Sequence, residues 1–155
     1  MSSLNHKLEA AKKIAREAHA SQVDKAGVDY FIGHLSSVAN SCENELEKIV
    51  GYLHDVAEDT EINESEVCNM LRNSGLFEEG ELTLIETALK TLNQKNHKNR
   101  NEYILAIKGN KLATMVKLKD LENNMNLKRL QVVTIKDIER VERYKREYNF
   151  LRDIM

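Results

Sequence analysis

Apolar residues recur at steps of three and four along nearly the whole chain, and no proline interrupts the pattern. The spacing is clearest over residues 8–19, 82–92, 112–124 and 135–151. Such steps place apolar side chains on one face of an α-helix, whereas a half-buried strand needs strict alternation, which no segment sustains. The sequence therefore predicts an all-α fold, a single-domain bundle of roughly seven or eight helices spanning residues 1–155.

Polar stretches mark where these helices end. Residues 21–33 are expected to form a loop, and shorter breaks are expected near residues 40–43, 60–63, 73–75, 93–101 and 109–110. Asn63 followed by Glu66, and Thr134 followed by Asp137, have the spacing of helix N-terminal caps. A helix that begins near Leu46 is expected to continue to about Thr60.

Composition excludes several classes of protein. With 41% hydrophobic and 31% charged residues, the chain is neither disordered nor membrane-spanning. No apolar run approaches the length of a membrane span and no signal sequence is recognisable, so a cytoplasmic protein is expected. The two cysteines have no metal-ligand spacing, and two buried thiols in a reducing compartment account for them.

The net charge of −2 conceals an uneven distribution. Residues 43–86 hold 13 acidic and 2 basic side chains, a balance of −11, whereas residues 90–129 hold 10 basic and 3 acidic ones, a balance of +7. An acidic half suits cations and a basic half suits phosphates, although charge runs are also common on solvated faces. The overall sign argues against a general nucleic-acid binder.

The most unusual stretch is residues 51–60, in which His54 and Asp55 are adjacent and are followed by Glu58 and Asp59. On a continuous helix, residues four apart stack on one face, so these four side chains would crowd one patch. Several carboxylates this close repel one another unless a cation lies among them, and a divalent metal is the obvious candidate. The alternative is a charged helix turn that faces water.

Asp120 and two histidines could complete a metal site. Asp120 falls between Leu118 and Leu121 in an apolar part of its helix, so its carboxylate is expected to point inward and to need a lysine or a metal as its partner. His19 and His34 lie at helix boundaries, where a histidine serves either as a ligand or as a structural hydrogen-bonding group.

Three segments together resemble a known family. Residues 15–34 (AREAHASQVDKAGVDYFIGH), 53–60 (LHDVAEDT) and 116–125 (VKLKDLENNM) are similar, in the same order, to motifs of the HD-domain phosphohydrolases. The likeness is to the hydrolase domain of the RelA/SpoT proteins and to small stand-alone alarmone hydrolases, and it extends over about residues 15–148.

The resemblance implies roles for named residues. The metal ligands would be His34, His54, Asp55 and Asp120. Glu58 and Asp59 match the acidic pair that handles the attacking water. Substrate contacts would come from Lys25, Asn124, Arg140 and Tyr144, and from either Lys98 or Lys95. Manganese is the usual ion of the family, and iron, cobalt, nickel or zinc also suits such ligands.

The same resemblance implies hydrolysis of guanosine 3′,5′-bis(diphosphate), ppGpp, or its triphosphate analogue, with release of pyrophosphate. Asp24 departs from the family, which has a base-binding arginine there, and Asp29 and Leu35 replace prolines. Asp24 leaves open another nucleotide or phosphorylated metabolite as substrate, and a non-catalytic nucleotide-binding module is a further alternative. Tyr144 could instead be a core residue and Arg140 a surface ion-pair residue.

Overall fold

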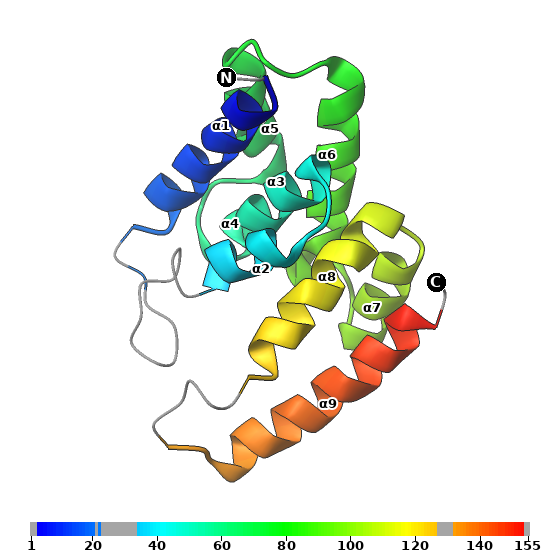
Figure 1. Ribbon diagram of the computed structural model, residues 1–155. Coiled ribbons are helices and arrows are strands. Elements are labelled where there is room, and N and C mark those ends of the chain that lie inside the picture. Colours follow the sequence, from blue (N-terminus) through cyan, green and yellow to red (C-terminus); the bar gives the residue numbers. More distant parts are fainter. Residues whose placement is uncertain (1–2, 21, 23–33, 127–131, 154–155) are drawn as a thin grey trace.

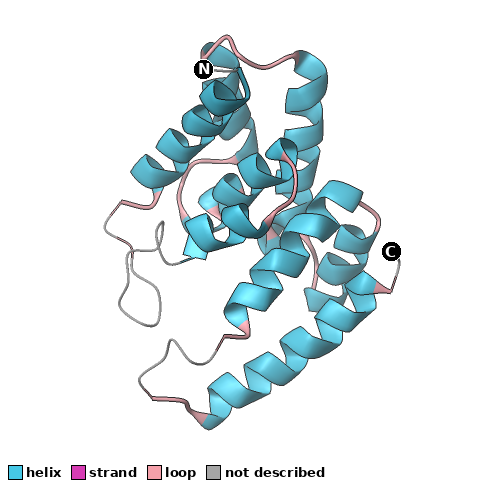
Figure 2. Cartoon of the chain, in the orientation of Figure 1, coloured by secondary structure: helices cyan, strands magenta, loops and turns pink. Residues whose placement is uncertain are grey.

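The structure, a computed structural model, describes residues 3–20, 22, 34–126 and 132–153. Within these ranges the chain forms helices and loops without a strand, so the all-α prediction is confirmed (Figure 2). Asp24, Lys25 and Asp29, for which the sequence made predictions, lie outside the described residues. No helix in the described ranges has the length and apolarity that crossing a membrane requires.

The described part of the chain contains the following helices, in sequence order. They are α1 (Ser3–Ala18), α2 (Ser36–Ser41), α3 (Glu45–Leu53), α4 (Val56–Asp59), α5 (Glu64–Asn73), α6 (Glu79–Leu92), the 3-10 helix η2 (Gln94–Asn96), α7 (Arg100–Lys108), α8 (Lys111–Asn124) and α9 (Ile135–Arg152). Both predicted caps are confirmed, because Asn63 and Thr134 each form a reciprocal capping box with the residue three positions later.

Helix α8 is the centre of the bundle. It contacts α2, α3, α6, α7 and α9, and it lies diagonally across the middle of Figure 1 with α9 running beside it. Its buried residues include the apolar Val116 and Leu121 but also the charged Lys117 and Asp120. Because neighbours surround α8 on several sides, residues on different faces of it are buried, and its polar residues can meet polar residues of other helices.

The predicted continuous helix from Leu46 to Thr60 is wrong. Helix α3 ends at Leu53, the separate four-residue α4 starts at Val56, and Asp55 between them has φ −100° and ψ −1°. These angles belong to the sparsely populated bridge region, in which a helix does not continue. The break places His54 and Asp55 at the junction of two helices rather than on one helix face.

Gly51 allows α2 and α3 to approach closely. A Cβ atom at Gly51 would lie 3.1 Å from the Cα atom of Ala39, a backbone atom that cannot move aside as a side chain can. Close contact between α2 and α3 also brings together the residues at their ends. His34 lies two residues before α2, His54 directly follows α3, and their ring centres are 5.5 Å apart.

Candidate metal centre

Three ligand atoms from three parts of the fold converge at the centre of the bundle. His34 precedes α2, His54 follows α3, and Asp120 lies on α8, and their ligand atoms all fall within 4.8 Å of one another. The Oδ1 atom of Asp120 is 2.8 Å from Nε2 of His34 and 3.4 Å from Nε2 of His54. All three side chains are buried. This group could hold a metal ion, as the sequence predicted for these residues.

Asp55, the fourth predicted ligand, lies beside this group. Its Oδ2 atom is 3.2 Å from Nε2 of His54 and 3.5 Å from Nε2 of His34. It therefore approaches both imidazoles from the junction of α3 and α4. Two imidazoles and two carboxylates form a mixed nitrogen and oxygen donor set, which suits first-row transition metals.

Hydrogen bonds fix which nitrogen each histidine offers to this group. Nδ1 of His54 lies 2.6 Å from the carbonyl oxygen of Gly51, and Nδ1 of His34 lies 2.7 Å from Oδ1 of Asn123. Both oxygens can only accept, so each Nδ1 carries a proton and donates it. In a neutral imidazole the lone pair is then on Nε2, the atom that faces the carboxylates.

Asn123 is a site residue that the sequence analysis missed. It follows Asp120 by three residues on α8, so helical spacing places both near the same face of the helix. That spacing was the available signal, but the family resemblance pointed to the next residue, Asn124. Asn124 also reaches the centre, because its Nδ2 donates to Oδ1 of Asp120 at 3.3 Å.

Asp120 has a second partner, the buried Lys117. The ammonium group of Lys117 donates to Oδ2 of Asp120 at 2.8 Å, which leaves Oδ1 for the imidazoles. The sequence left open whether a lysine or a metal accompanies Asp120. In the structure Lys117 binds Oδ2 of Asp120, while Oδ1 faces the two histidines of the group that could hold a metal.

Charge pairing shifts the pKa values of the cluster in the metal-free protein. Burial alone would lower the pKa of His34, but hydrogen bonds to Asp120 and Asp55 and their charges raise it to about 9. The pKa of His54 is also raised, since the two carboxylates outweigh the effect of its burial. Conversely, burial would raise the pKa of Asp120, whereas Lys117 and the imidazoles hold it well below its usual value.

A divalent metal fits this arrangement. Nε2 of His54 is buried and makes no hydrogen bond, although two carboxylate oxygens lie 3.2 and 3.4 Å away. A buried polar atom without a hydrogen bond is unfavourable, and a cation would satisfy it. The donor atoms, the fixed Nδ1 protons and the acidic side chains therefore agree with a bound divalent ion.

Glu58 and Asp59, the acidic pair of α4, follow His54 and Asp55 closely in sequence, and one of the two is more buried than the other. Glu58 is half-buried, and burial together with the charge of Asp55 raises the pKa of its carboxyl group, whereas Asp59 is exposed. Lys95 of η2 donates to the backbone carbonyl of Glu58 at 2.5 Å, so this lysine lies beside α4. Lys98 is exposed on the loop that follows η2.

The remaining predicted substrate residues lie on α9. Arg140 is half-buried and forms an ion pair with Asp137 at 3.2 Å. Tyr144 is half-buried, packs against the hydrophobic core, and has Arg143 5.2 Å from its ring centre. Arg140 therefore has the ion pair, and Tyr144 the core packing, that were named above as alternatives to substrate binding. His19 is buried, with Nδ1 3.1 Å from Oε1 of Gln22.

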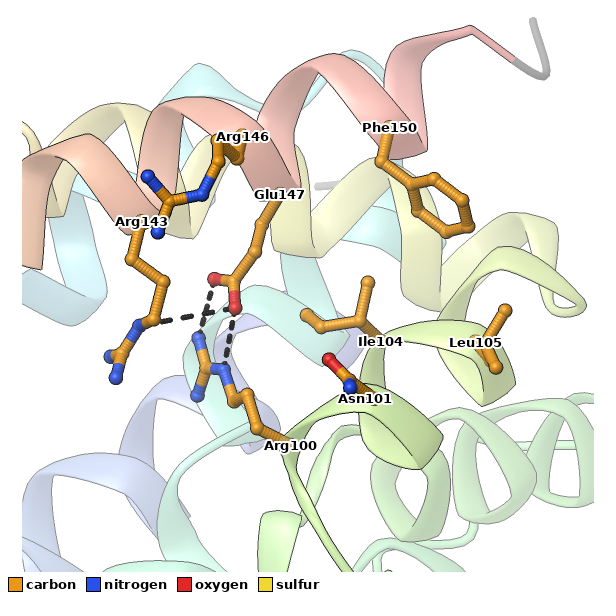
Figure 3. Close-up of a pocket in the computed structure, with 8 residues that line it drawn as sticks. All are labelled: Arg100, Asn101, Ile104, Leu105, Arg143, Arg146, Glu147 and Phe150. Atoms are coloured by element: carbon orange, nitrogen blue, oxygen red, sulfur yellow. Dashed lines mark hydrogen bonds and ion pairs between the residues drawn. The ribbon is translucent and has the colours of Figure 1, made fainter.

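A separate surface pocket of about 630 Å³ lies between α7 and α9. Figure 3 shows Glu147 reaching from α9 to Arg100 on α7, with Arg143 and Phe150 at the pocket walls. Arg100 donates two hydrogen bonds to Glu147, at 2.7 and 2.8 Å. The pocket contains none of the predicted metal ligands, so it is distinct from the metal centre.

Comparison of the chain with protein-family models gave no match, and comparison with curated proteins gave none either.

Proposed function

We propose that this protein is a metal-dependent phosphohydrolase whose substrate is a phosphorylated nucleotide, with ppGpp or its triphosphate analogue as the first candidate. The observation that carries the proposal is the convergence of His34, His54 and Asp120, within 4.8 Å, next to a short helix that bears two further carboxylates. A site that only held a structural cation would not require the additional acidic pair.

His34, His54, Asp55 and Asp120 would hold the ion, and manganese is the proposed one. When bound, a divalent ion would act as a Lewis acid that withdraws charge from a phosphoryl oxygen and makes a neighbouring water more acidic. The hydrogen bonds from the Nδ1 atoms to Gly51 and Asn123 keep both imidazoles oriented for this task.

Glu58 is the proposed general base. Burial and the charge of Asp55 raise the pKa of Glu58 toward neutral pH. A carboxylate with a raised pKa is a stronger base, which favours removal of a proton from the attacking water. The water oxygen bonds to phosphorus as the bond between phosphorus and the leaving oxygen breaks, and the leaving oxygen takes up a proton. Asp59, one residue later and exposed, would orient the water from the solvent side.

For ppGpp the bond that breaks joins phosphorus to the 3′ oxygen of the ribose. The products would be pyrophosphate and GDP, or GTP from the triphosphate analogue. Lys95 is the better placed of the two candidate phosphate-binding lysines, because its ammonium group lies against the backbone of Glu58. Asn124, Arg140, Tyr144 and Lys25 remain proposed substrate contacts.

A second candidate substrate class is another nucleotide or phosphorylated metabolite. Asp24, an anion where the resembled family has a base-binding arginine, favours this alternative. The test is a product assay with manganese-loaded protein on ppGpp, its triphosphate analogue, nucleoside monophosphates and deoxynucleotides. Pyrophosphate release from ppGpp alone supports the first candidate, and turnover of another compound supports the second. Stoichiometric metal without turnover of any compound would contradict the proposed enzyme.

A further inference from the structure

Lys117 is an unusual residue to find in the interior of the bundle. Its side chain is 8% exposed, and its ammonium group lies 2.8 Å from Oδ2 of Asp120 and 5.2 Å from the ring centre of Tyr103. Burying an ammonium group removes it from water at a large desolvation cost, and an apolar side chain of similar size would fill the same space without that cost. A buried cation in this position therefore suggests a role beyond packing.

Because of the contact with Lys117, the two carboxylate oxygens of Asp120 have different partners. Oδ2 accepts a charge-assisted hydrogen bond from Lys117, while Oδ1 lies 2.8 and 3.4 Å from the Nε2 atoms of the two histidines. Lys117 and Asp120 are three residues apart on α8, a spacing that holds their side chains together. Oδ1 accepts only the longer, uncharged hydrogen bond from Asn124 at 3.3 Å, so the short bond from the Lys117 ammonium group makes Oδ2 the poorer metal ligand of the two oxygens.

The number of oxygens offered matters for the choice of ion. Calcium takes six to eight oxygen ligands and commonly uses carboxylates through both oxygens, whereas first-row transition metals accept imidazole nitrogen and fewer ligands. A carboxylate restricted to one oxygen therefore disfavours calcium more than it disfavours manganese.

We infer that Lys117 determines metal selectivity: by occupying one oxygen of Asp120 it enforces single-oxygen coordination and favours manganese over calcium. The inference rests on the metal centre of the proposed function and adds to it a residue that the ligand set does not include. Lys117 contacts a ligand rather than the ion, so it is a positioning residue.

The test compares two ions in one protein. Dissociation constants for Mn²⁺ and Ca²⁺ are measured by calorimetric titration of chelator-treated wild type, Lys117→Met and Lys117→Arg. Lys117→Met frees Oδ2 and is expected to lower the ratio of the calcium constant to the manganese constant by about tenfold, the scale of effects from groups that orient metal ligands. Lys117→Arg keeps a cationic donor beside Asp120 that competes with the metal for carboxylate oxygens, so the preference for manganese over calcium is expected to remain.

Lys119→Met is the matched control. Lys119 is the other lysine next to Asp120 in sequence, but its ammonium group pairs with Glu122 at 3.6 Å instead. The same chemical change there is expected to leave the ratio unaltered. If Lys117→Met weakened both ions equally, Lys117 would have only a structural role and the inference would be wrong.

A second measurement does not depend on whether Lys117→Met folds. In a crystal structure of the manganese-loaded wild type, Asp120 is expected to bind through Oδ1 alone, with Oδ2 on Lys117, and coordination through both oxygens would overturn the inference. Because these experiments measure binding rather than turnover, an unchanged ion ratio contradicts only the role of Lys117. Failure of the wild type to bind Mn²⁺ would instead contradict the metal centre itself.

Discussion

The imidazole of His34 donates from Nδ1 to Oδ1 of Asn123 at 2.7 Å, a hydrogen bond between residues 89 positions apart in the chain. It joins the segment before α2 to the end of α8, and it fixes Nε2 of His34 toward Asp120. A ligand oriented in this way loses less freedom when a metal binds, because its ring position is already set.

Asn123→Ala is therefore expected to weaken Mn²⁺ binding by about 10- to 100-fold, the range typical for loss of a group that orients a metal ligand. Titration calorimetry of the chelator-treated protein measures the change. Asn149→Ala, at an exposed position on α9, is the control and is expected to bind Mn²⁺ like the wild type. Equal affinities of the Asn123 variant and the control would show that the hydrogen bond does not orient the ligand.

Separating metal binding from turnover tests the roles of His54 and Glu58. His54→Ala removes a proposed ligand and is expected to abolish metal retention, measured by elemental analysis of the purified variant. Glu58→Ala is expected to keep the metal and to lose activity by at least about 100-fold, the scale of general base catalysis. Glu61→Ala, an exposed position after α4, provides the control. Full activity of Glu58→Ala would show that another group takes the proton.

The periodicity of apolar residues was sufficient to predict the helical fold. The family resemblance predicted that His34, the His54–Asp55 pair and Asp120 come together, and the structure brings His34, His54 and Asp120 into one group that could hold a metal. The break between α3 and α4 was not predictable from that pattern. At this junction α2 packs close to Gly51, and Nδ1 of His54 donates to the carbonyl oxygen of Gly51. Helical spacing alone could not show this.

Partners distant in sequence were also beyond prediction. The Arg100–Glu147 pair joins residues 47 positions apart and depends on how α7 and α9 meet. Lys117 was different, because it is three residues from Asp120, and the sequence had left a lysine and a metal as alternative partners. The sequence could not show that Asp120 can have both partners, with the lysine on one carboxylate oxygen and the metal group on the other.

The protonation of the cluster predicts how stability depends on pH. In the metal-free protein the pKa of His34 is about 9, above its ordinary 6.5, so the folded state binds this proton more tightly than the unfolded state. The resulting stabilisation is fully present below about pH 6.5 and is lost as the pH rises through about 9. The raised pKa of His54 acts in the same direction.

With a chelator present, the melting temperature is therefore expected to fall between about pH 6.5 and about pH 9, as measured by differential scanning fluorimetry. Saturating Mn²⁺ is expected to raise the melting temperature more at the higher pH, because the metal competes with the imidazole protons. His34→Gln serves as a comparison, since it lacks the titrating group and should show a smaller alkaline loss. A melting temperature independent of pH in the chelated wild type would contradict the proposed protonation.

Two arginine–glutamate pairs provide a matched test of how burial affects stability. Arg100 binds Glu147 through two nitrogens at 2.7 and 2.8 Å, with side chains 23% and 10% exposed. Arg72 binds Glu79 with the same two-nitrogen geometry, at 2.8 and 3.0 Å, but with side chains 44% and 72% exposed. Solvent screens the second pair. Loss of Arg100, by contrast, would leave the largely buried Glu147 with the longer contact to Nε of Arg143, 3.9 Å away.

Arg100→Met is thus expected to lower the free energy of unfolding by about 2–3 kcal/mol, below the full range for a completely buried pair because both side chains retain some exposure. Arg72→Met is expected to change it little. Urea unfolding followed by circular dichroism measures both variants. In the double variant Arg100→Met/Glu147→Leu the uncompensated carboxylate is removed, so part of the lost stability should return. Equal effects of Arg100→Met and Arg72→Met would show that the pair between α7 and α9 contributes no more than a surface ion pair.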